Sequence, residues 1–339
     1  MALVPFLVAS RSLGKTRKQS SRPPAYGLIM GTLNLHHYGV PAENAPLNAV
    51  SKLAPFSALI ISIILVILFA VRFYLLEAFL IRRLYGTTYT KLSLENQRGF
   101  INHHIAGTMK IIILIIAAYP FISVIIGQSS FHTPYVRGSP VKLGDILIVA
   151  AQMLIGMYIF ELLYRIKLSP IAVLHHLGTI VIGQAAIAIG LDRVREPDAG
   201  IEFMLCLIWG VFDIISEFFP HLAIILYRVY PHRHQFLSRV FFYSCLTTAI
   251  GTLCETVVTM FLFGCLWDRW QIAFKIATPL LHTAFSAAQV HGSVVFWRMY
   301  KRQQVFLKEG VSQQLVEDAQ TEGEESENKS GPLDVREFA

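Results

Sequence analysis

The stretch from Ser169 to Gly190, SPIAVLHHLGTIVIGQAAIAIG, is almost entirely apolar, yet it contains the adjacent histidines His175 and His176. Pro170 suits the first position of a helix that follows an N-capping serine, so we expect a helix to begin there. At about 1.5 Å per residue this helix is long enough to cross a hydrocarbon layer of ~30 Å. Ionisable side chains are costly in that layer and usually face a polar interior. The stretch therefore predicts a membrane-spanning helix that contributes two imidazoles to a site.

Composition extends this prediction to the whole chain. Of its 339 residues 54% are hydrophobic and only 15% are charged, and the mean hydropathy is +0.52, which is too apolar for an ordinary soluble protein. About seven runs are long enough to span a bilayer. They are Leu53–Phe79, Gly107–Gly127, Leu143–Tyr164, Pro170–Gly190, Ile201–Tyr227, Val240–Leu266 and Ile272–Trp297. Helices satisfy their backbone groups without water, so we expect an all-α membrane protein. Its fold would be a bundle of about seven transmembrane helices around a polar cavity that opens to the cytoplasmic side.

The charges indicate a membrane topology rather than a nucleic-acid partner. The formal net charge is +7, but the basic residues lie in short segments between the apolar runs, as Arg82, Arg165 and Arg298 do. Such segments are typical of cytoplasmic loops. The positive-inside rule then places the C-terminus in the cytoplasm and the N-terminus in the lumen. We expect membrane lipids as partners and no nucleic acid.

The ends of the chain differ from its middle. Residues 1–50 are basic and rich in Ser and Pro, and we interpret them as a disordered tail, with a targeting sequence as the alternative. Residues 51–89 contain the first transmembrane helix and a linker. Residues 90–303 form the main helical domain, with about six transmembrane helices. Residues 304–339 become acidic and lack the apolar surface that offsets ordering entropy, which predicts a second disordered tail.

A polar stripe marks the fifth run. Asp213, Glu217 and His221 recur at i, i+4 and i+8, so they share one face of an otherwise apolar helix and should point inward. Other spans contribute further candidates for the lining of a polar cavity. These are Glu161, Thr179, Glu255, His282 and His291. A cavity with such a lining and with apolar walls suits an amphiphile, whose head group or thioester would meet the polar cluster while its chain lies among the walls.

Structural interpretations of the same residues stay open at this point. The paired histidines can simply form hydrogen bonds between helices, which contribute about 0.6 kcal/mol each in membrane bundles. We expect His103 and His104 at a wet membrane boundary. Glu255 and His282 are deep, and a mutual structural pair would explain both. The spaced His-x-x-His-His clusters of membrane iron enzymes are absent from the sequence, so we expect no metal ligands.

Several of these segments resemble the TLC-domain family, the group that includes the ceramide synthases. The pattern Leu-His-His-Leu-Gly-Thr, from Leu174 to Thr179, matches its double-histidine motif. Asn96–Ile105 resembles the polar opening of that domain, Phe212–Glu217 its acidic segment, and Val290–Arg302 its closing aromatic and basic helix. The resemblance covers roughly residues 90–303.

The ceramide synthases have an acyl-transfer centre that uses fatty acyl-CoA as co-substrate. The resemblance implies a similar centre in this chain, with no other cofactor. Carried over, His175 and His176 would be the reacting pair and Asp213 the orienting group or base, with Thr179 beside them. This chain departs from the synthase pattern, because Phe212 and Ser216 stand where the synthases have histidine and aspartate.

The departure favours the branch of the family that is not known for synthase activity. The expected function is therefore that of a multi-pass protein of the endoplasmic reticulum membrane that binds or handles lipids, such as sphingolipids, and influences membrane lipid composition. The first alternative is an acyl-CoA-dependent lipid acyltransferase. The second is a trafficking or structural role.

Overall fold

A computed structural model describes residues 50–191 and 199–308, and nearly all of this part of the chain is helical. Two short 3-10 turns are η3 (Ala54–Phe56), which opens the described chain, and η5 (Trp267–Arg269), which lies near its other end. The main elements in chain order are α2 (Ser57–Ala70), the π-helical η4 (Val71–Leu80), α3 (Ile81–Tyr85), α4 (Thr87–Thr90), α5 (Leu94–Ile125), α6 (Leu143–Tyr164), α7 (Pro170–Ile189), α8 (Ala199–Val229), α9 (His234–Cys265) and α10 (Ile272–Lys308).

Within residues 50–191 and 199–308, six helical segments are long and apolar enough to cross a membrane, so the all-α membrane bundle is confirmed. They are Ala54–Tyr85, Leu94–Ile125, Leu143–Tyr164, Pro170–Ile189, Gly200–Val229 and His234–Cys265. The expected seventh span, Ile272–Trp297, lies within α10. That helix has 37 residues and is long enough, but it is less apolar than the other six and does not count among them.

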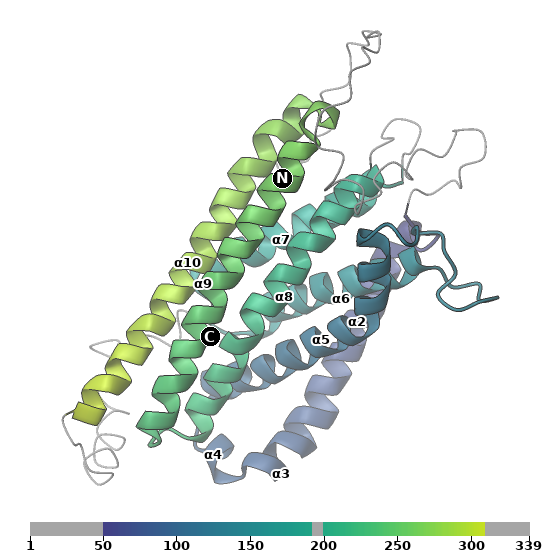
Figure 1. The fold of residues 1–339 in the computed structure, drawn as a ribbon. Coiled ribbons are helices and arrows are strands. Elements are labelled where there is room, and N and C mark those ends of the chain that lie inside the picture. The colour runs from purple at the N-terminus through teal and green to yellow at the C-terminus, as the bar shows by residue number, and fades with distance from the viewer. Residues whose placement is uncertain (1–49, 192–198, 309–339) are drawn as a thin grey trace, which may run out of the picture.

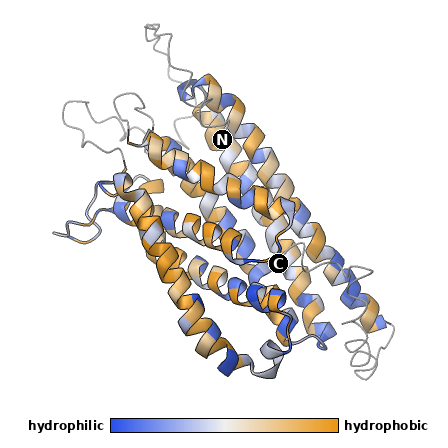
Figure 2. Ribbon diagram, turned by 180° about the vertical axis from the view of Figure 1, so that it is seen from behind, coloured by the Kyte–Doolittle hydropathy of each residue, from blue (hydrophilic) through white to orange (hydrophobic). Residues whose placement is uncertain are grey.

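The helices form two groups that meet at α8 (Figure 1). α9 and α10 run side by side along their length, and α8 packs against α9. On the other side of α8 lie α5, α6 and α7, while α2 covers the outer face of α6. Figure 2 shows that apolar residues dominate the helix formed by α2 and η4, whose outward side chains lipid can cover without losing hydrogen bonds.

Small residues allow the helices to approach closely. The clearest case is Gly251 of α9, where a Cβ atom would lie only 2.0 Å from the Oγ atom of Ser216 on α8. Glycine at such a crossing brings two backbones together, as is common in membrane bundles. This contact holds α9 against the helix that carries the polar stripe.

The structure confirms the predicted start of one helix and shifts the predicted inner boundaries of the two tails. Ser169 caps α7, because its Oγ accepts a hydrogen bond from the backbone N–H of Ala172 at 3.1 Å. Val50, the last residue of the predicted N-terminal tail, is buried against α6. At the other end α10 continues through residues 304–308, where the sequence predicts the start of the acidic tail. The remaining tail predictions, for residues 1–49 and 309–339, lie outside the described part of the chain.

Candidate functional site

His175 of α7 lies between two carboxylates of α8. Its Nε2 atom is 3.4 Å from Oδ1 of Asp213 and 3.2 Å from Oε1 of Glu217. Tyr158 of α6 supports both acids, because its hydroxyl donates to Oδ2 of Asp213 and, at 3.1 Å, to Oε2 of Glu217. His175 is only 8% exposed and Asp213 only 6%. The structure thus gathers these side chains from three helices into a buried cluster, which we call the central cluster.

Lys110 belongs to the same cluster. It comes from the middle of α5, its side chain is fully buried, and its Nζ atom lies 2.6 Å from Oε2 of Glu217. A charged group inside a membrane span usually pairs with an opposite charge, and Lys110 does so here. Lys110 was not among the predicted site residues, although a lysine inside the apolar run Gly107–Gly127 is itself a signal of a functional or structural site.

The two adjacent histidines face different acids. Nε2 of His176 lies 3.4 Å from Oε2 of Glu161, and the other oxygen of that carboxylate accepts a hydrogen bond from Arg165 at 2.7 Å. The His176 ring stacks on Tyr158 with 4.4 Å between ring centroids. Successive residues of a helix point about 100° apart. The two histidines therefore contact two separate polar groups rather than one.

His103 is buried, contrary to the expectation of a wet boundary position. It is 2% exposed, and its Nδ1 atom lies 2.9 Å from Nδ1 of His221 on α8. The reason is that α5 begins at Leu94 and packs along α8, so residue 103 lies more than two turns inside the bundle. His104 is partly buried, and its Nε2 atom lies 2.9 Å from the Tyr85 hydroxyl.

A second polar group surrounds Glu255 of α9. Its carboxylate accepts hydrogen bonds from the indole N–H of Trp209 and, at 2.9 Å, from Nε2 of Gln289. His282 lies nearby, with 3.9 Å between its Nδ1 and the carboxylate, so the structure brings together the two residues expected to form a structural pair. This group joins α8, α9 and α10.

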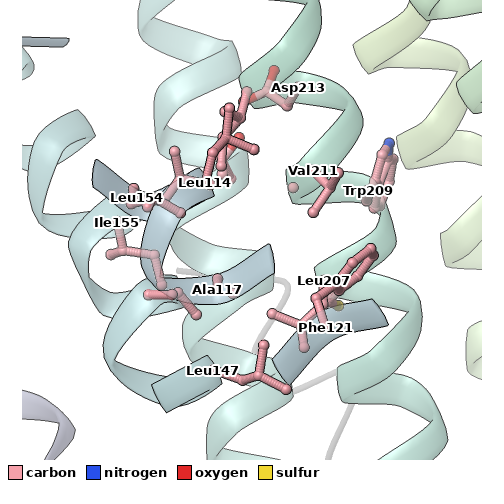
Figure 3. Close-up of a pocket in the computed structure, with 18 of the residues that line it drawn as sticks. Leu114, Ala117, Phe121, Leu147, Leu154, Ile155, Leu207, Trp209, Val211 and Asp213 are labelled. Atoms are coloured by element: carbon pink, nitrogen blue, oxygen red, sulfur yellow. The ribbon is translucent and has the colours of Figure 1, made fainter. Parts of the chain in front are cut away.

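Two cavities flank the central cluster. The larger, of about 280 Å³, lies among α5, α6, α7 and α8 and is almost entirely apolar. In Figure 3 Asp213 lies at one end of this cavity and Leu147 at the other. The smaller, of about 80 Å³, has several charged and imidazole side chains in its lining, among them His175, His176 and Glu217. We call them the chain cavity and the polar cavity.

The predicted cavity residues divide between these two spaces. Thr179, Asp213 and Glu255 line the chain cavity. Glu161, Glu217 and His221 line the polar cavity together with both histidines of the pair. The inward orientation expected of the α8 stripe thus agrees with the structure. His282 contacts Glu255 without reaching either cavity, and His291 lines neither.

Four residues that the sequence analysis did not single out complete the site. They are Lys110, Tyr158, Arg165 and Gln289. Gln289 lines both cavities and so lies where they meet. Lys110 has a signal in the sequence, whereas the role of the other three residues is visible only in the packing of the helices. Among the described residues, His175, Asp213 and Glu217 also have ligand atoms within 4.8 Å of one another, which is close enough to share one ion.

No family model matches the sequence, and neither the curated proteins nor the solved structures contain a match. The likeness to the TLC-domain family therefore stays a prediction from the segments quoted above, and the multi-pass helical architecture stands on the structure itself.

Proposed function

We propose that this protein binds a single-chain lipid inside the bundle and thereby influences the lipid composition of its membrane. The observation that carries the proposal is the chain cavity, whose apolar walls end at Asp213, beside His175. Its volume of about 280 Å³ is just below the range of small-molecule sites, about 300–1,000 Å³. An acyl or alkyl chain fits among such walls, with its head group at the central cluster.

The lining of the chain cavity favours a head group that donates hydrogen bonds. Asp213 and Glu255 contribute acidic groups, and no Lys, Arg or His lines this cavity among the described residues. The buried Oε1 atom of Gln289 has no hydrogen-bond partner within the chain. A lipid hydroxyl or amide N–H would satisfy this acceptor, whereas a free carboxylate or phosphate would be repelled by the two acids.

The experiment is lipid identification on the full-length protein, purified in a mild detergent. We expect native mass spectra to show a copurified lipid. Ala117, 9% exposed, lines the chain cavity, and Ala117→Phe should fill it and remove the bound lipid or replace it with a shorter one. The control is Ile115→Phe on the same helix, where the side chain is 73% exposed and points away from the bundle. A lipid that is absent, or equal in both variants, would reject the proposal.

Acyl transfer from acyl-CoA is a second candidate, and the position of His175 favours it. An imidazole beside two carboxylates can exchange a proton with them, which suits a nucleophile or a base. The protein would then transfer an acyl group to a lipid acceptor in the membrane of the endoplasmic reticulum. Incubation with acyl-CoA should give an acylated product that His175→Ala abolishes and His291→Ala leaves unchanged. Loss of activity in both variants, or in neither, would remove this candidate.

A further inference from the structure

Within the central cluster, His175, Asp213 and Glu217 bring three possible ligand atoms close together without hydrogen bonds between them. Nε2 of His175 is 3.2 Å from Oε1 of Glu217 and 3.4 Å from Oδ1 of Asp213, yet neither separation has hydrogen-bond geometry. Nε2 and Oδ1 both lack a hydrogen-bond partner, although both side chains are more than nine-tenths buried. Buried polar atoms are rarely left unpaired, so these atoms indicate a missing partner that they share.

The charges of the cluster point to a cation as that partner. Asp213 and Glu217 carry two negative charges, and Lys110 supplies one positive charge against Glu217. With His175 neutral, as a metal ligand must be, one negative charge is left over in a buried position within the membrane span. Uncompensated charge in such surroundings is strongly unfavourable, and a bound cation would offset it.

The spacing of the ligand atoms fits a transition-metal ion. Zinc binds imidazole nitrogen and carboxylate oxygen at about 2.0–2.2 Å, which places tetrahedral ligands about 3.3–3.6 Å apart. The two separations from Nε2 are close to that spacing. All the ligand atoms lie within 4.8 Å of one another, so rotation of a carboxylate suffices to adjust the third separation.

The other carboxylate oxygens are already occupied by supporting groups. Tyr158 donates to Oδ2 of Asp213 and Oε2 of Glu217, and Lys110 also contacts Oε2. Such outer partners typically orient the ligands of a metal site. They leave Oδ1 and Oε1 directed toward His175.

We propose that Nε2 of His175, Oδ1 of Asp213 and Oε1 of Glu217 bind one divalent transition-metal ion of the zinc class, between the chain cavity and the polar cavity. With three protein ligands, a tetrahedral ion keeps a fourth position open. This inference differs from the expectation drawn from the sequence, because one ligand comes from α7 and two from α8, so no single sequence motif contains all three. An ion on Nε2 would also block acyl transfer through that nitrogen.

The test is elemental analysis of the full-length protein, purified without chelators and with an affinity tag that contains no histidine. We expect about one equivalent of metal per chain, retained after dialysis. Asp213→Asn, which is nearly isosteric, and His175→Ala should lose it, while His291→Ala should retain it. Replacement by Co²⁺ should give the visible absorption of a tetrahedral site in the wild type and in His291→Ala only.

Three results would overturn the proposal. The first is a wild-type protein that stays free of metal after incubation with Zn²⁺, Mn²⁺ and Fe²⁺. The second is an ion that persists in Asp213→Asn and His175→Ala, because it would be bound elsewhere. The third is a loss of metal in every variant including His291→Ala. None of these depends on a copurified lipid, so failure of this proposal is distinguishable from failure of the lipid proposal.

Discussion

Nζ of Lys110 lies 2.6 Å from Oε2 of Glu217, and this ion pair joins α5 to α8 inside two membrane spans. The lysine side chain has no exposed surface, while the glutamate side chain is 23% exposed. The lysine charge depends on the glutamate, because it does not reach bulk water to be solvated. The pair also holds Glu217 in place beside His175.

Removing one partner of this pair should destabilise the bundle more than removing both. We expect Lys110→Met or Glu217→Gln alone to lower the free energy of unfolding in detergent by about 3–5 kcal/mol, because each leaves an unpaired buried charge. The double variant should lose clearly less than the sum. Unfolding titrations followed by circular dichroism measure this. Additive losses would show that the ion pair does not couple the two helices.

The stability of the protein should depend on the acceptor oxygens of Glu255 but not on its charge. Glu255→Ala leaves the N–H groups of Trp209 and Gln289 without an acceptor, at a cost of about 1–3 kcal/mol for each group. Glu255→Gln retains an oxygen for the indole and offers an amide N–H to the unpaired Oε1 of Gln289. Thermal unfolding should therefore rank the glutamine variant near the wild type and the alanine variant well below it. Equal losses would contradict this account of the Glu255 group.

Gly251 should tolerate no side chain while Ser216 faces it. In Gly251→Ala the new Cβ would lie 2.0 Å from the Ser216 Oγ, and we expect a cost of about 1–3 kcal/mol from overpacking. Ser216→Ala alone should be nearly neutral, because that hydroxyl has no hydrogen-bond partner. The double variant should recover most of the loss, since the next contact is 3.1 Å. If the serine substitution gives no recovery in the same unfolding assay, another contact limits this crossing.

The loop between α5 and α6 should face the lumen. Arg137 in this loop is exposed, and Arg137→Asn produces an Asn-Gly-Ser sequon with Gly138 and Ser139. The positive-inside rule predicts that microsomes will glycosylate it, and that the native sequon Asn328-Lys329-Ser330 stays unmodified. Arg137→Gln is the matched control. Glycosylation at Asn328 instead would reverse the orientation.

The helices themselves were predictable, because their causes are local. The run Leu143–Tyr164 has the bounds of α6, and the Ser169-Pro170 cap places the start of α7. Both follow from the thickness of the bilayer and from capping chemistry. The seventh run, Ile272–Trp297, forms part of a longer helix that is less apolar than the six spans. The length of the run therefore predicted a helix correctly, although its hydropathy does not mark it as a span.

The site was only partly predictable. Asp213, Glu217 and His221 repeat at helical spacing, and this period revealed their shared face. Tyr158 and Lys110 were not identified, because the central cluster takes only one residue from each of α6 and α5, so no repeat within either helix marks them. His103 was misplaced because the predicted apolar run begins only at Gly107. The sequence does not show that α5 begins earlier, at Leu94.

The sequence alone determines the membrane spans, the helix caps and the inward face of α8. Apolar length, cap chemistry and helical period each act within one segment, so no tertiary contact is needed to predict them. Tertiary packing decides that His175 meets the acids of α8 while His176 meets Glu161, and that Lys110 reaches Glu217. The reason is geometric. Which side chains meet depends on the rotation and the axial offset of one helix against another, and these are set by close contacts such as Gly251 against Ser216.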